Sequence, residues 1–142
     1  MEVVDDEQTG RTDGAGYLVL GRQECLAHLA AGGLGRIAVN VGALPAILPV
    51  HFTLHDEHVV FSVAAGTTLD RATRDSVVAF ETDGHGADGG APWSVSVTGM
   101  ARHVDGGEQA MAAVDRLPAW TAADNRRVVA VSTDYLSGRR SR

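Results

Sequence analysis

The chain contains 142 residues, 44% of them hydrophobic, and carries a formal net charge of −6. That length allows one hydrophobic core and therefore one domain, while the negative charge excludes broad affinity for nucleic acid phosphates. No apolar run approaches the roughly 20 residues of a membrane span, and the acidic start does not resemble a signal peptide. Because Cys25 is the only cysteine, no intrachain disulfide can form, and we expect a cytoplasmic protein.

The acidic charge is concentrated at the N-terminus. Residues 1–16 carry five carboxylates against Arg11, a net charge of −4. They also contain three glycines and few apolar side chains, so we predict a mobile acidic tail over 1–16 and a single domain over 17–142. All twelve basic residues are arginine, so any cationic contact to a phosphate must come from a guanidinium group.

The first predicted helix covers residues 22–31, because Cys25, Leu26 and Leu29 share one face at helical spacing. Two glycines follow it and are typical of a helix end. Apolar residues then alternate with small or polar ones over 37–41, which predicts a strand.

A β-hairpin is predicted over residues 44–64. Its first strand alternates an apolar face with a mixed face that contains Pro49 and His51, and the polar turn 55–58 leads into a second apolar run. Because proline lacks a backbone donor, we expect Pro49 at a sheet edge or a bulge. In chain order, the later predicted elements are a strand over 76–81, a loop over 83–91, a strand over 93–104, a helix over 106–117 ended by Pro118, a last strand over 127–132, a short turn over 134–136 and a solvated arginine-rich end over 137–142.

Four segments taken in order carry a family resemblance. LPVHF at 48–52, VVF at 59–61, AGTTLD at 65–70 and WSVSVTGMARHV at 93–104 resemble the pyridoxamine 5'-phosphate oxidase-like family of flavin-binding split barrels. The similarity runs from about residue 22 to residue 140. It implies a mainly β fold, a six-stranded antiparallel split barrel with a few short helices, and a homodimer that holds FMN or a deazaflavin cofactor in the groove between its subunits.

The same resemblance implies a set of cofactor contacts. They lie on the hairpin, on the turn and helix start after it, and at the start of the long strand: Pro49, Val50, His51, Ser62, Val63, Gly66, Thr67, Thr68, Leu69, Arg71, Trp93 and Ser94. In relatives, an arginine and a lysine directed at the FMN phosphate usually stand where this chain has Ser62 and Thr68. Both positive charges are therefore missing.

The turn after the hairpin has two interpretations. Thr67 and Thr68 could offer amide and hydroxyl donors to a phosphate, supported by Arg71 and Arg74. The same residues match a capping box in which Thr67 caps the helix and the carboxylate of Asp70 would repel a phosphate. The sequence leaves both interpretations open.

Other candidate side chains also have two interpretations. His51 could bond the polar edge of a flavin ring or be an ordinary strand residue, and Trp93 could wall the flavin or belong to an interface or the core. Trp120 could close over the groove or cover the barrel end. His51, His55 and His58 raise the possibility of a metal or haem, but no cysteine pair or HExxH pattern accompanies them, and we assign no metal site.

No nucleophile–base pair and no GxSxG, Rossmann or P-loop pattern is present, so we assign no catalytic side chain. This fits flavin chemistry, in which the cofactor ring transfers the hydride. The leading hypothesis is an FMN- or deazaflavin-dependent oxidoreductase acting on a small organic substrate, with no nucleic acid or membrane partner. The alternative is a non-catalytic split-barrel binding or sequestering module that has lost its cofactor, which the missing charges at Ser62 and Thr68 support.

Overall fold

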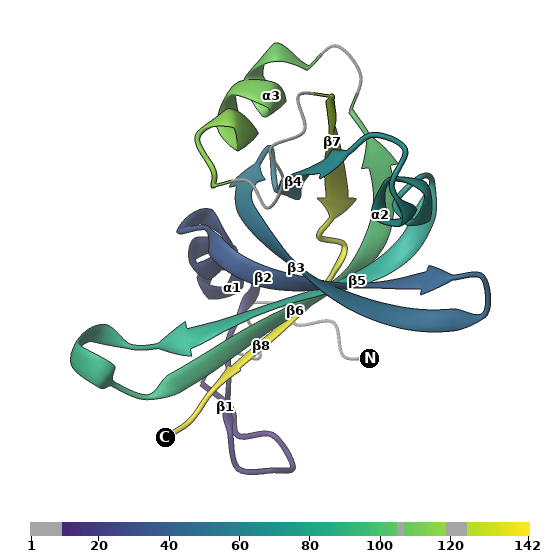
Figure 1. The fold of residues 1–142 in the computed structure, drawn as a ribbon. Helices are drawn as coiled ribbons and strands as arrows, with labels where there is room; N and C mark the ends of the chain where they lie inside the picture. The colour runs from purple at the N-terminus through teal and green to yellow at the C-terminus, as the bar shows by residue number, and fades with distance from the viewer. Residues whose placement is uncertain (1–9, 105–106, 119–124) are drawn as a thin grey trace.

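The structure, a computed structural model, describes residues 10–104, 107–118 and 125–142. Its strands form one antiparallel sheet in the order β1-β8-β6-β5-β2-β3-β4-β7, which closes because β7 also pairs with β6 (Figure 1). The closed part is a six-stranded barrel, and β8 and β1 extend it at one edge. The predicted mainly β barrel fold is thus confirmed. The strands are β1 (Leu18–Val19), β2 (Gly33–Val41), β3 (Leu44–His55), β4 (His58–Ala64), β5 (Ser76–His85), β6 (Pro92–His103), β7 (Arg126–Ser132) and β8 (Tyr135–Arg140).

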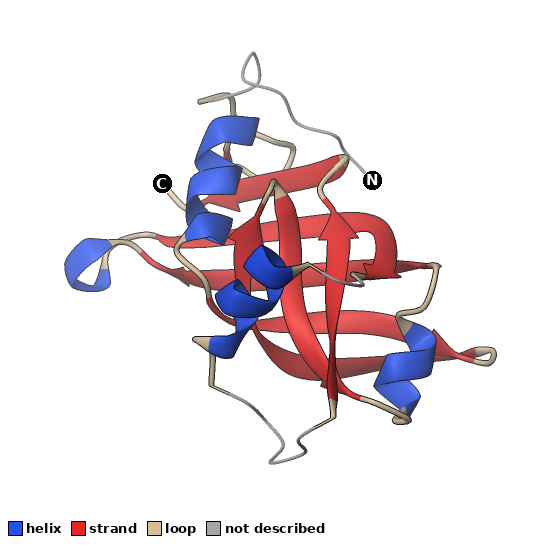
Figure 2. Ribbon diagram, turned by 90° about the horizontal axis from the view of Figure 1, so that it is seen from above, coloured by secondary structure: helices blue, strands red, loops and turns tan. Residues whose placement is uncertain are grey.

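Three short helices, α1 (Arg22–Ala30), α2 (Thr68–Ala72) and α3 (Glu108–Asp115), lie outside the barrel wall, and a 3₁₀ turn, η2 (Ala87–Gly89), ends the β5–β6 hairpin (Figure 2). None of the helices in the described part of the chain has the length and apolarity that crossing a membrane requires.

The core fills the barrel because alternate residues of each strand point inward. Phe52 of β3 and Phe80 of β5 meet edge to face inside it, with ring centroids 4.7 Å apart. On α1, the predicted face of Cys25, Leu26 and Leu29 is buried. The helix ends before Gly32, whose positive φ and closeness to the Phe52 carbonyl leave no room for a Cβ atom.

The C-terminal end of the chain corrects a prediction. Residues 134–136 do not form a turn before a solvated tail. Instead β8 pairs with β6 from Trp93 to Thr98, so the strand over 127–132 is not the last. Leu136 is fully buried, and Gly138 packs where a Cβ atom would overlap Cys25 Sγ. The sequence pattern does not predict β8, because Gly138 occupies an inward-facing position and contributes no apolar side chain to the alternation.

Several boundaries also differ from prediction. β5 continues to His85, into the predicted 83–91 loop, because cross-strand pairing of Asp83 with Ser94 and of His85 with Pro92 overrides the low strand propensity of the segment. The helix predicted over 106–117 is described over Glu108–Asp115.

The predicted tail is described in part. Residues 1–9 lie outside the described residues. Within 10–16, the Gly10 N–H donates to the Val19 carbonyl at 3.0 Å, and an Asp13 carboxylate oxygen lies 3.5 Å from Arg139. The domain boundary after residue 16 stays a prediction.

Candidate functional site

A groove opens where β3 and β4 separate. The two strands pair only beside their connecting turn, at residues 53–55 with 58–60. Beyond that point β3 pairs with β2 alone and β4 with β7 alone, so Pro49 occupies an open edge as predicted. The split leaves a groove of about 500 Å³ with mostly apolar walls, the kind of concavity that binds small molecules. Its lining residues are Leu48, Pro49, Val50, His51, Ser62, Val63, Ala64, Thr67, Thr68, Leu69, Leu117 and Pro118.

Most of the predicted contact residues meet in this groove. Pro49, Val50, His51, Ser62, Val63, Thr67, Thr68 and Leu69 all line it. Arg71 lies at its rim, where one guanidinium nitrogen donates to the Gly66 carbonyl at 2.8 Å and another approaches Thr68 Oγ1 at 3.4 Å. Gly66 and Arg71 thus adjoin the lining residues without being part of the wall.

Trp93 and Ser94 are not brought to this groove within one subunit. They lie in a separate depression of about 400 Å³ beside Tyr17 and Arg139. The indole stacks on His28 with ring centroids 3.8 Å apart and crosses Gly84, where a Cβ atom would come within 2.8 Å of the ring. A contact of these two residues with the groove of a partner subunit stays a prediction, and Trp120 lies outside the described residues.

Sequence reasoning missed the wall contributed by α3. Ala110 and Val114 of that helix pack against Val60 and Val128 on the outer side of the barrel. This packing carries Leu117 to the far side of the groove, together with Pro118. Helical spacing predicts the apolar face of α3, but nothing local in the sequence says which strands that face covers.

The turn before α2 adopts the capping interpretation. Thr67 Oγ1 accepts the Asp70 N–H at 3.2 Å and donates its own hydrogen to the Ala64 carbonyl at 2.7 Å. An Asp70 carboxylate oxygen accepts the Gly66 N–H at 2.7 Å. The Thr67 hydroxyl hydrogen is therefore already used, and Thr68 is the threonine whose hydroxyl can donate to a ligand in the groove.

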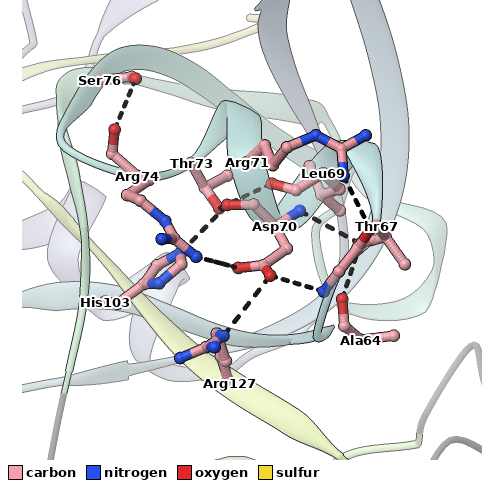
Figure 3. A network of polar contacts seen from close by, with 11 residues as sticks. Ala64, Thr67, Leu69, Asp70, Arg71, Thr73, Arg74, Ser76, His103 and Arg127 are labelled. Carbon is pink, nitrogen blue, oxygen red and sulfur yellow. Dashed lines mark hydrogen bonds and ion pairs between the residues drawn. The ribbon is translucent and has the colours of Figure 1, made fainter.

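Arg71 and Arg74 do not act together, which corrects the prediction that both could turn back toward a phosphate. Figure 3 shows their side chains extending to different sides of α2. Arg74 pairs with Asp70, one helical turn before it, at 3.7 Å. The guanidinium group left at the groove rim is that of Arg71.

Asp70 itself is buried among basic groups. Burial by itself raises the pKa of this carboxyl, but the Gly66 hydrogen bond and the nearby basic side chains outweigh burial and hold the pKa below its ordinary value. The carboxylate is therefore charged at neutral pH. The basic neighbours are Arg74, His103 and Arg127.

The histidines of the β3–β4 turn lie elsewhere. His55 and His58 line a second depression, of about 550 Å³, beside the start of α3. Within the ranges that the structure describes, no three histidine, cysteine, aspartate or glutamate side chains are grouped so that they could hold a metal ion.

Comparison with known proteins identifies the family. The family model for pyridoxamine 5'-phosphate oxidase matches residues 21–140. This chain belongs to the pyridoxamine 5'-phosphate oxidase-like family. The Mycobacterium tuberculosis protein Rv0080 is 32% identical to this chain over 124 residues, which cover 84% of this chain and 82% of the relative.

Solved structures of similar proteins include the FAD-binding protein of Mycobacterium smegmatis. It is 33% identical, with a TM-score of 0.71, and the match covers 87% of this chain and 99% of that one. The Corynebacterium diphtheriae protein DIP1874 is 26% identical with a TM-score of 0.68, over 89% and 98% of the two chains. The family resemblance drawn from the sequence is therefore confirmed.

Proposed function

We propose that this pyridoxamine 5'-phosphate oxidase-like protein binds a flavin in the groove between β3 and β4 and acts as an oxidoreductase on a small organic substrate. The observation that carries the proposal is the groove itself, because it gathers most of the residues that family membership implies as cofactor contacts. A bound flavin would supply hydride chemistry. The protein's part would be to bind the flavin, orient it and exclude water.

The groove fits the two ends of a flavin differently. Leu48, Pro49 and Leu69 offer apolar surface for a planar ring, with half-buried His51 beside them. At the other end, Thr68 and the rim guanidinium of Arg71 are the donors for an anionic tail. Family members that hold FMN usually present two cations there, so the fit is good for the ring and weak for a phosphate monoester.

We extend the proposed cofactor from FMN to FAD on this ground. A phosphate monoester carries a charge of about −1.5 to −2 at neutral pH, whereas each phosphate of the FAD diphosphate carries a single charge. One guanidinium and a hydroxyl suit the lower charge density better. The Mycobacterium smegmatis relative, described as FAD-binding, supports the same choice.

A homodimer is part of the proposal. The outer face of the sheet beside the groove carries exposed apolar side chains, with Ile47 72% exposed and Val77 60% exposed, next to the ion pair of Arg36 with Glu81. Ile47 stands directly across from Ala38, which in turn stands across from Ala79, so these residues make a continuous row over three strands. A second copy packed on this face would remove it from water and close the groove.

The binding test titrates the purified full chain with FAD, FMN, riboflavin and a deazaflavin cofactor while visible absorbance and flavin fluorescence are recorded. We expect saturable binding with FAD tighter than FMN. Arg71→Gln should lower the affinity for FAD and for FMN by about tenfold. The affinity for riboflavin, which has no phosphate, should stay unchanged. Arg116→Gln, an exposed arginine beyond the end of α3, is the matched control.

A gain-of-function variant tests the cofactor choice. Ser62→Arg combined with Thr68→Lys restores the two family cations and should raise FMN affinity about tenfold or more, with riboflavin unchanged. His58→Arg combined with Gln109→Lys adds the same charge outside the groove and should have no effect. A double variant that binds FMN no better than the natural chain would contradict our placement of the phosphate.

Catalysis needs its own readout. The flavin-loaded protein would be reduced under anaerobic conditions and then mixed with small oxidised organic compounds. Reoxidation of the flavin would be followed by visible absorbance. The alternative of a non-catalytic binding module is favoured by the missing cations at Ser62 and Thr68. A chain that binds none of the four cofactors would support that alternative and overturn the enzyme proposal.

A further inference from the structure

The carboxylate of Asp70 is unusually placed for a charged group. The side chain is 2% exposed, and carboxylates are almost never that buried unless they are paired. Figure 3 shows it enclosed by groups from the turn before α2, from the residues after α2, and from strands β6 and β7. Removing a charge from water in this way is costly, and the groups around the carboxylate offset that cost.

The two carboxylate oxygens differ in how well they are bonded. Oδ2 accepts the Gly66 N–H at 2.7 Å, a short charge-assisted hydrogen bond, and lies 3.5 Å from Arg127 Nε. Oδ1 has no hydrogen-bond partner within the part of the chain that the structure describes. It has only looser ionic neighbours, His103 Nε2 at 3.3 Å and Arg74 Nη2 at 3.7 Å. The best-made contact of Asp70 is therefore the one to the Gly66 amide.

His103 is held in one orientation by the same residue. Its Nε2 lies 3.1 Å from the Asp70 backbone carbonyl. Because a carbonyl oxygen can only accept, this nitrogen must carry the hydrogen and donate it to the carbonyl, while the nitrogen itself lies 3.3 Å from Asp70 Oδ1. The histidine and the two arginines surround the Asp70 charge on the sides away from Gly66.

Gly66 links this buried carboxylate to the groove. It has a positive φ of 82°, its N–H is held by Asp70, and its carbonyl accepts the Arg71 guanidinium at 2.8 Å. The next residues along the chain, Thr67 and Thr68, line the groove. Any movement of Gly66 would therefore shift both the Thr68 hydroxyl and the guanidinium of Arg71.

We propose that Asp70 is a positioning residue for the anionic tail of the ligand. Its carboxylate fixes the Gly66 amide and so sets Thr68 and Arg71 at the groove rim, while Arg74 and Arg127 offset its charge so that the tail is not repelled. The inference rests on the proposed flavin site, but it assigns a role to a residue that does not touch the ligand.

Two substitutions separate the hydrogen bond from the charge. Asp70→Asn keeps an oxygen that can accept from Gly66, whereas Asp70→Ala removes the acceptor. Both should lower the unfolding temperature, so affinities are measured where circular dichroism shows each variant folded. We expect Asp70→Ala to bind FAD and FMN about tenfold more weakly and Asp70→Asn to stay within about threefold of the natural chain. Riboflavin should bind all three alike.

A second variant and a second readout do not depend on how well alanine is tolerated. Asp70→Leu keeps the same branched arrangement of side-chain heavy atoms without an acceptor and should lose FAD and FMN affinity as Asp70→Ala does. Amide hydrogen exchange at Gly66 should be slow in the natural chain and in Asp70→Asn, and fast in the other two variants.

Three results would overturn the positioning role. They are unchanged FAD affinity in both Asp70→Ala and Asp70→Leu, an equal loss in Asp70→Asn, and a loss for riboflavin as large as that for FAD. If the natural chain binds no flavin, the proposed function fails. In that case amide hydrogen exchange at Gly66 is the remaining test of whether Asp70 fixes this amide. Slow exchange in Asp70→Ala and Asp70→Leu would overturn the inference.

Discussion

Two arginines of the same short segment have different surroundings. Arg74 lies one helical turn after Asp70 and pairs with it, whereas Arg71 turns toward the Gly66 carbonyl and the groove rim. A positive charge that faces a buried carboxylate is largely offset by it, so it contributes little to the field at the groove. The anion-binding capacity of this segment therefore depends on which arginine pairs with Asp70.

Asp70 should also make stability depend on acidity. Its folded pKa lies below the ordinary value of 3.8, so the charged carboxylate stabilises the fold above that pH, and this contribution is lost as the pH falls toward the folded pKa. Urea unfolding followed by tryptophan fluorescence should show the natural chain to be more stable than Asp70→Asn at pH 7. The difference should shrink between about pH 5 and about pH 3. A difference that stays constant over this range would contradict a lowered pKa.

Among the elements, β6 changes partner along one edge. Trp93 to Thr98 pair with β8, whereas Ala101 to His103 pair with β7. The chain passes from β7 to β8 opposite Gly99, which packs so closely on Ser132 that a Cβ atom would overlap the Ser132 carbonyl oxygen. This close approach lets one strand belong to both the closed barrel and its extension.

Gly99→Ala should therefore destabilise the fold strongly. The backbone of Ser132 cannot move without disturbing the pairing of β7, so we expect a loss of at least about 2 kcal/mol in the free energy of unfolding, measured by urea denaturation. Gly14→Ala is the matched control, because open space surrounds Gly14 and its φ is not positive. The control should change stability by less than about 1 kcal/mol. If the two substitutions lowered the free energy of unfolding equally, the close approach of Gly99 to Ser132 would be contradicted.

At the scale of the whole molecule, two features lie side by side. The groove between β3 and β4 is open, and the adjoining outer face of β2, β3 and β5 carries exposed apolar side chains. Strand pairing brings Pro49 of the groove opposite Arg36, and Ile47 of the apolar face opposite Ala38. A single contact with a second subunit would therefore affect both the apolar face and the groove.

Ile47→Asp should convert the proposed homodimer to a monomer. A carboxylate in the middle of an apolar interface would have to lose its hydration without a partner, which is strongly unfavourable. Light scattering coupled to size-exclusion chromatography should give twice the chain mass for the natural protein and the single chain mass for the variant. Met111→Asp, an exposed apolar position on α3, is the control and should remain dimeric. A natural chain that is monomeric at all concentrations would contradict the dimer.

Local patterns in the chain are enough to predict the β3–β4 hairpin, the buried face of α1 and most of the segments that form the groove, and they include the capping of α2 by Thr67 as one of two open interpretations. Each of these depends on residues a few positions apart, where periodicity and side-chain capping act directly. The order of motifs along the chain also leads to the correct family. The chain itself therefore carries the fold class and most of the groove wall.

Contacts between distant segments decide the rest. The groove opens because β3 and β4 stop pairing beyond their turn. Its far wall is present because α3 packs on the outer side of the barrel. Arg71 is the arginine at the groove rim because Arg74 pairs with Asp70. The strand β8 exists because β6 offers it a free edge, although its own inward positions include a glycine. Such features have no local signal, because their energies come from long-range packing and from the charge surrounding a buried carboxylate.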